Sequence, residues 1–148
     1  YGEWWSTHGI RESVNSYLGY WGEDGGSDWD SLRYAAEIRG FTVTGLYDDW
    51  GYYRWWTLDD LAAEADAGHP VILLVRYWSL PDHEEEEWWG DHYIVFLGFT
   101  SDGGVVYHDP AFGNEYLGSY RVMSQERLMR AWTRTATGLI CTGMALVW

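Results

Sequence analysis

The chain of 148 residues contains no lysine and a single cysteine. All nine basic side chains are therefore arginines, which excludes mechanisms that depend on a lysine amine, such as Schiff-base catalysis or a phosphate-binding P-loop. Because Cys141 has no second cysteine to pair with, an intrachain disulfide is excluded and crosslinks cannot indicate the compartment. No apolar run is long enough to cross a bilayer, which argues against membrane insertion.

Positive charge is scarce as well. The 23 acidic side chains leave a formal net charge of −14 and a sequence pI near 4.4. Such a chain repels nucleic acid phosphates and anionic lipid, so neither is expected as a partner. The length and the hydrophobic fraction of 47% predict a single globular domain over residues 1–148, with a core of ordinary size.

Aromatic residues are abundant by contrast, with 12 tryptophans and 12 tyrosines. Three clusters, at 4–5, 50–56 and 88–89, lie in polar or glycine-rich surroundings, so we expect part of them to be exposed. Exposed aromatic patches indicate contact with a peptide or protein partner, a glycan or another copy of the chain, as in a homo-oligomer. The alternative is that these rings cover loops against the core. The composition favours an extracellular or cell-surface bacterial protein.

Hydrophobic periodicity predicts an α+β fold in which helices pack on a mostly antiparallel sheet. Helices are expected to begin near residues 6, 28, 57 and 124. Strands are expected at 41–46, 71–75, 92–99, 105–109, 120–122 and 143–148. Thr57 and Asp60 have the spacing of a capping box at the start of the third helix.

The strands at 92–99 and 105–109 form a predicted hairpin around the turn at 100–104. His92 begins the first strand and Asp109 ends the second, where Pro110 stops the ladder. The two ends are neighbours in an antiparallel pair, so an imidazole and a carboxylate are expected to meet there. That is the base and its orienting group of a nucleophilic site.

The order of these motifs resembles the papain-like cysteine peptidases of the bacteriocin-processing, leader-cleaving type. The matching segments are 67–75, 91–95 with Gly98, 109–110 with Gly113, 120–124 with Trp132 in the helix that follows, and 145–147. The resemblance implies a papain-like fold in which His92 is the general base and Asp109 orients it. We predict no metal or other cofactor.

The chain departs from that family at the nucleophile. The family's catalytic cysteine begins the first long helix, with an oxyanion-hole glutamine just upstream, and the helix N-terminus stabilises the thiolate. Here no cysteine precedes Cys141 and no glutamine precedes Gln125. Tyr1-Gly2 matches a turn that often ends the catalytic helix. The expectations are therefore a helix missing from this sequence, a helix supplied by another chain, or a pseudopeptidase that has lost it.

Other candidate sites are weaker. Cys141 lies near the last strand instead of at a helix start, so a buried structural role is expected. Ser6-Thr7-His8 is better explained as a helix cap than as a nucleophile and base. The segment 82–91 contains His83 and four adjacent glutamates, but it lacks the ligand spacing of a calcium or zinc site and is expected to be a solvated loop. His108 and His69 are expected to be structural.

The leading hypothesis is thus a peptidase-like domain that lacks its nucleophile, is not catalytic as given, and acts in peptide or protein binding or in extracellular assembly. One alternative is an active cysteine peptidase whose catalytic cysteine lies outside this sequence. Another is a structural subunit that self-assembles through its aromatic patches.

Overall fold

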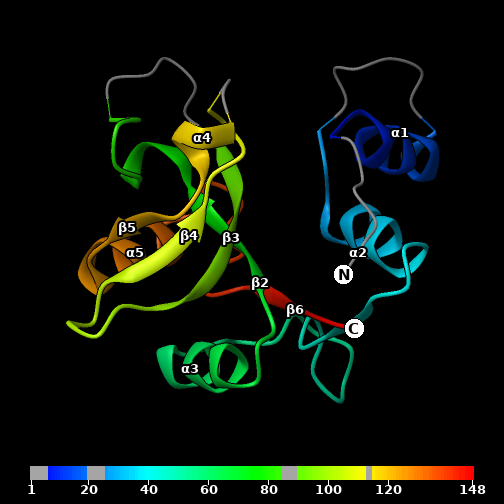
Figure 1. The fold of residues 1–148 in the computed structure, drawn as a ribbon. Helices are drawn as coiled ribbons and strands as arrows, with labels where there is room; N and C mark the ends of the chain where they lie inside the picture. The colour runs from blue at the N-terminus through cyan, green and yellow to red at the C-terminus, as the bar shows by residue number, and fades with distance from the viewer. Residues whose placement is uncertain (1–6, 20–25, 85–89, 113–114) are drawn as a thin grey trace. The chain divides into compact units, whose positions relative to one another are not determined.

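A computed structural model of the chain describes residues 7–19, 26–84, 90–112 and 115–148 (Figure 1). Within it the chain divides into two compact units, residues 1–43 with Trp148 and residues 44–147. Several residues singled out in the sequence lie outside the described residues: Tyr1-Gly2, Trp4-Trp5, Ser6, the glutamates 85–87, Trp88-Trp89 and Gly113.

The first unit contains helices α1, Thr7–Leu18, and α2, Trp29–Glu37. Asp28 begins α2 through a capping box, in which its carboxylate accepts the Ser31 N–H at 2.8 Å and the Ser31 hydroxyl accepts the Asp28 N–H at 3.1 Å. Arg39, just after α2, donates hydrogen bonds to two acceptors in α1 and one in α2. These bonds join the two helices.

The second unit is built on an antiparallel sheet with the strand order β6-β2-β3-β4-β5. Its strands are β2, Val71–Arg76; β3, Asp91–Phe99; β4, Val105–His108; β5, Arg121–Met123; and β6, Gly143–Val147. A further short strand, β1, Thr42–Thr44, spans the boundary between the two units. β2 is an aliphatic run paired with a strand on each side, and most of its side chains are buried, in part because α5 packs against it.

The strand register places the start of β3 and the end of β4 side by side. Val75 of β2 is paired with His92, which puts His92 at the start of β3. On the other side of β3, Val95 is paired with His108, the last residue of β4. Asp109 therefore leaves the ladder beside the start of β3.

Helices cover this sheet and supply much of its core. They are α3, Leu58–Asp66; the 3₁₀ turn η1, Tyr77–Ser79; α4, Glu115–Gly118; and α5, Gln125–Trp132. α5 packs against β2 and η1, and α3 packs against β3. Thr57 and Asp60 form the predicted capping box of α3, with the Thr57 N–H donating to the Asp60 carboxylate at 2.8 Å.

The predicted α+β class with helices on an antiparallel sheet is confirmed. The sequence did not predict η1 and α4, because three or four residues are too short to show a helical period. In the part of the chain that the structure describes, no helix is long and apolar enough to cross a membrane. A single domain over 1–148 and the missing catalytic helix stay predictions.

Candidate functional site

Asp109 lies directly after β4, where the backbone turns away from the sheet. Its own N–H donates to the Gly118 carbonyl of α4 at 2.8 Å, which ties the turn to that helix. Its Oδ1 accepts the Ala111 N–H at 2.9 Å across Pro110, a local turn that aspartate favours. The side chain is completely buried, so the carboxylate can be satisfied only by neighbouring protein groups.

His92 provides one of those groups. Its Nε2 lies 2.8 Å from Asp109 Oδ1, and its side chain is 15% exposed. An ionised carboxylate only accepts hydrogen bonds, so Nε2 carries a proton, and in the neutral ring Nδ1 keeps its lone pair. No hydrogen bond to Nδ1 is made by any described residue. The structure thus brings together the two residues that the hairpin predicted to be neighbours, and it leaves a basic nitrogen available on His92.

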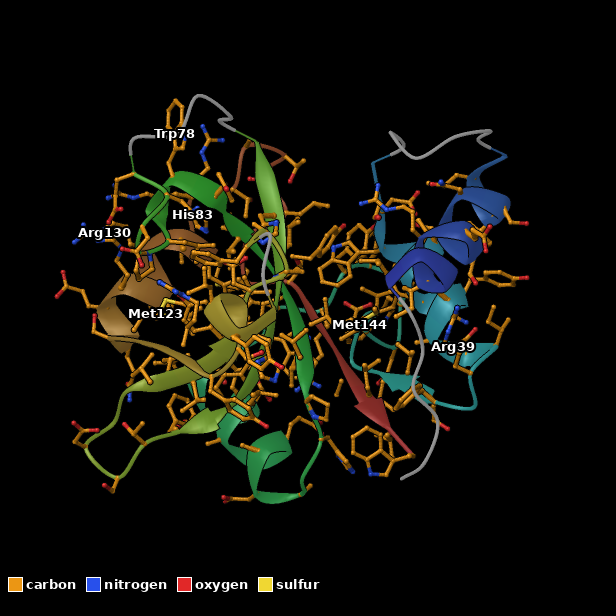
Figure 2. The ribbon with its side chains drawn as sticks, turned by 45° about the horizontal axis from the view of Figure 1, so that its top comes forward. Arg39, Trp78, His83, Met123, Arg130 and Met144 are labelled. Atoms are coloured by element: carbon orange, nitrogen blue, oxygen red, sulfur yellow. The ribbon has the colours of Figure 1, made fainter. Side chains whose placement is uncertain are left out.

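His83 was missed by the sequence analysis as part of this site. Its Nε2 lies 3.0 Å from Asp109 Oδ2, and its side chain is only 3% exposed. The Tyr77 ring stacks on His83 at 4.2 Å between centroids and presents its edge to His92 at 5.3 Å. Figure 2 shows Trp78 directed away from this unit, whereas His83 is directed into it. The Asp109 carboxylate therefore lies between two imidazoles.

The hydrogen bonds favour the ionised form of Asp109. Burial alone would raise the pKa of this carboxyl, because it disfavours the charge. The hydrogen bonds from His92, the Ala111 N–H and His83 outweigh burial, and the pKa lies below its usual range. The site thus holds a buried negative charge between two ring N–H donors, the environment that an orienting carboxylate requires.

Two arginines hold the segment that carries His83. Arg121 of β5 forms an ion pair with Asp82, the residue before His83. Arg127 of α5 pairs with Glu84, the residue after it, and also donates to the Ser79 and Leu80 carbonyls. The expectation of a solvated loop is wrong for His83, whose side chain is 3% exposed, whereas the Asp82 and Glu84 side chains are 67% and 49% exposed.

The described acidic residues of segment 82–91 do not form a cation site. The Asp91 carboxylate accepts hydrogen bonds from the Ala136 N–H at 2.6 Å and the Thr137 N–H at 2.9 Å, so it orders a loop. Among residues 7–19, 26–84, 90–112 and 115–148, no group of three or more histidine, cysteine or acidic side chains is arranged to hold a metal ion.

Cys141 lies in the core, just before β6. Its N–H donates to the Trp132 carbonyl at 3.0 Å, and its carbonyl accepts the Trp56 N–H at 2.8 Å. Burial raises the pKa of the thiol, which disfavours the thiolate that a nucleophile needs. The structure gives Cys141 the surroundings of a structural residue.

The side chains of the remaining candidates make other contacts. The His108 Nδ1 accepts the Tyr120 N–H at 3.0 Å, and burial lowers the pKa of this imidazole. The His69 Nδ1 lies 2.8 Å from a Glu64 oxygen in a half-buried pair. Thr7 and His8 belong to α1, in the first unit.

The protein is an α+β protein with a papain-like fold. Its helices pack on an antiparallel sheet, and the His92–Asp109 pair lies where β3 begins and β4 ends. A model of the Peptidase C39-like family matches residues 6–139, and the chain belongs to this family. A crystal structure from Bacillus anthracis, described as a C39-like peptidase, matches with a TM-score of 0.50 and 16% sequence identity. That match covers 80% of this chain and only 57% of the solved one. No curated protein matches the chain.

Proposed function

We propose that this chain is a peptidase-like domain that binds peptides and does not cleave them by itself. The observation that carries the proposal is the pairing of His92 and Asp109 in a sequence whose one cysteine is buried elsewhere with a raised thiol pKa. A base and its orienting group without an accessible thiolate lack the nucleophile that a cysteine peptidase uses.

An exposed apolar surface beside the pair supports peptide binding. We call it the α4–β5 surface; it comprises Tyr116, Leu117, Tyr120 and Val122, all more than half exposed. It is continuous with the site, because α4 accepts the Asp109 N–H and the Tyr120 N–H donates to His108. Aromatic groups of this kind are common at the centre of peptide and protein interfaces. The net charge of −14 favours basic peptides.

The second candidate is an active cysteine peptidase of the bacteriocin-processing type, whose thiolate comes from a segment or chain outside this sequence. That thiolate would attack the peptide carbonyl while His92 transfers the proton to the leaving amine and Asp109 orients His92. The lone pair on the His92 Nδ1 supports this alternative, since it is the atom that would accept the thiol proton.

A binding and cleavage assay separates the two. A labelled library of extended, basic decapeptides is incubated with the protein, retention is measured by fluorescence anisotropy, and new peptide termini are sought by mass spectrometry. The variants are His92→Ala and, as a matched control, His69→Ala, which removes a histidine from a half-buried pair in the same unit.

Retention without new termini is the expected result. Cleavage that is lost in His92→Ala and kept in His69→Ala would replace the proposal with the enzyme. If the protein neither retains nor cleaves any peptide, both candidates are removed.

Self-assembly through aromatic patches is a third candidate, favoured by one loop. Trp50 is 81% exposed and Tyr52 is 73% exposed, although both N–H groups donate to the Asp48 carboxylate and the loop is thereby ordered. An ordered loop that presents large apolar rings to solvent is typical of an interaction surface. We propose an extracellular or cell-surface location for either role; surface labelling of producing cells tests it.

A further inference from the structure

We propose that His83 is a positioning residue, which fixes the Asp109 carboxylate and thereby the ring of His92. The inference rests on the proposed function only in taking Asp109 and His92 as the family's site. His83 becomes the third side chain of this site, and it belongs to the segment 82–91, whose composition predicts an exposed loop.

The hydrogen bonds around the carboxylate carry the argument. Oδ1 accepts from the His92 Nε2 at 2.8 Å and from the Ala111 N–H at 2.9 Å, and Oδ2 accepts from the His83 Nε2 at 3.0 Å. Both oxygens are thus held, and the plane of the carboxylate cannot rotate without breaking a bond. Both imidazoles donate through Nε2, because an ionised carboxylate only accepts hydrogen bonds.

The surroundings hold His83 in that geometry. Tyr77 stacks on one face of its ring with an interplanar angle of 24°, and the Phe112 ring lies 5.0 Å away. Arg121 and Arg127 anchor the residues on either side of His83 from β5 and α5. A solvated side chain needs no such anchoring, whereas a donor aimed at a buried carboxylate does.

Without His83, Oδ2 would be a buried acceptor with one donor fewer. The carboxylate would then be held through Oδ1 alone, by the His92 Nε2 and the Ala111 N–H, so its rotation about the Cβ–Cγ bond would be less restricted. Loss of one charge-assisted hydrogen bond should change the equilibrium between the held and the rotated carboxylate by about tenfold or more. The looser hold on the carboxylate should appear at His92, whose ring makes only a T-shaped contact with Tyr77.

The test uses two substitutions that separate the hydrogen bond from the packing. His83→Phe keeps an aromatic ring against Tyr77 and removes the donor. His83→Gln keeps an N–H donor and removes the ring. Imidazole ¹⁵N shifts of the full chain report the tautomer of His92, and exchange with solvent reports how firmly its Nε2–H is held.

We expect parent His92 to be the Nε2–H tautomer. In His83→Phe the His92 Nε2–H should exchange about tenfold faster or more, and both tautomers should be populated. In His83→Gln the exchange should stay within about threefold of the parent, since the donor is kept. His69→Phe is the control and should change neither quantity.

Unchanged or slower exchange in His83→Phe would overturn the proposal, because His92 would then be held without His83. Equal effects of the Phe and Gln variants would overturn it as well, since packing would explain both. If His83→Phe does not fold, His83→Gln decides: faster exchange there refutes a role through the donor. None of these measurements needs a peptide, so a failure of peptide binding leaves the result intact.

Discussion

Replacing Gly118 with alanine should displace Asp109, because Gly118 lies against its backbone. A Cβ at Gly118 would lie 2.1 Å from the Asp109 carbonyl oxygen and 3.5 Å from the Phe112 Cβ. Real Cβ contacts essentially never fall below 3.0 Å, so the carbonyl must move by about 0.9 Å. The backbone bond from the Asp109 N–H to the Gly118 carbonyl, 2.8 Å long, would be strained by the same movement.

The expected cost follows from these contacts. Overpacking of a buried position costs about 1–3 kcal/mol, and a lost backbone hydrogen bond adds about 1 kcal/mol. Alanine recovers about 0.4–1 kcal/mol because it restricts the unfolded chain. We therefore expect Gly118→Ala to lower the free energy of unfolding by about 1–3.6 kcal/mol.

Urea denaturation followed by tryptophan fluorescence measures this change, and ¹⁵N shifts of His92 report whether Asp109 has moved. Gly26→Ala is the matched control: a Cβ there meets nothing within 4 Å, and its backbone is not left-handed. That variant should be neutral or slightly more stable. The reasoning is refuted if Gly118→Ala stays within about 0.5 kcal/mol of the parent, which is the size of an ordinary surface substitution.

Three further predictions concern other residues. The pKa of Asp109 is depressed in the folded state, so the unfolded chain binds more protons and the free energy of unfolding should fall as pH drops below about 4. In Asp109→Asn, the urea midpoint should change less between pH 5 and pH 3 than in the parent. A pH dependence equal to that of the parent would contradict this. Native Cys141 should resist iodoacetamide at neutral pH and react once unfolded, as mass mapping would show; rapid native labelling would restore it as a nucleophile. If the chain self-assembles, sedimentation velocity should show association that Trp50→Ser with Tyr52→Ser abolishes, and a strict monomer at every concentration would remove that candidate.

The parts of the fold that follow from local chemistry could be predicted from the sequence. Hydrophobic periodicity located the longer helices and all strands of the second unit, and the Thr57–Asp60 spacing located the start of α3. The meeting of His92 and Asp109 was predictable for the same reason. They are 17 residues apart on one hairpin, and a single turn determines which ends are neighbours.

The contact between His83 and Asp109 could not be predicted in this way. The two residues are 26 positions apart, and His83 lies outside the hairpin that carries Asp109 and belongs to no helix or strand. Asp82 and Glu84 flank His83 and indicate solvent exposure when the sequence is taken locally. The arginines that neutralise them lie 39 and 43 residues away, so only the tertiary fold shows that these acids anchor the segment.

This arrangement bears on how the His92–Asp109 pair is interpreted. Among the residues that the structure describes, the hydrogen bonds to the Asp109 carboxylate come from the second unit, through two imidazoles and one backbone N–H. None of these bonds requires a thiolate or a substrate. The pair therefore contributes to the fold by itself, because loss of Asp109 would remove the acceptor of two imidazoles and loss of His92 would remove one donor from a buried carboxylate. A domain without a nucleophile would have the same reason to keep the pair, so the pair is consistent with a binding domain as well as with a peptidase.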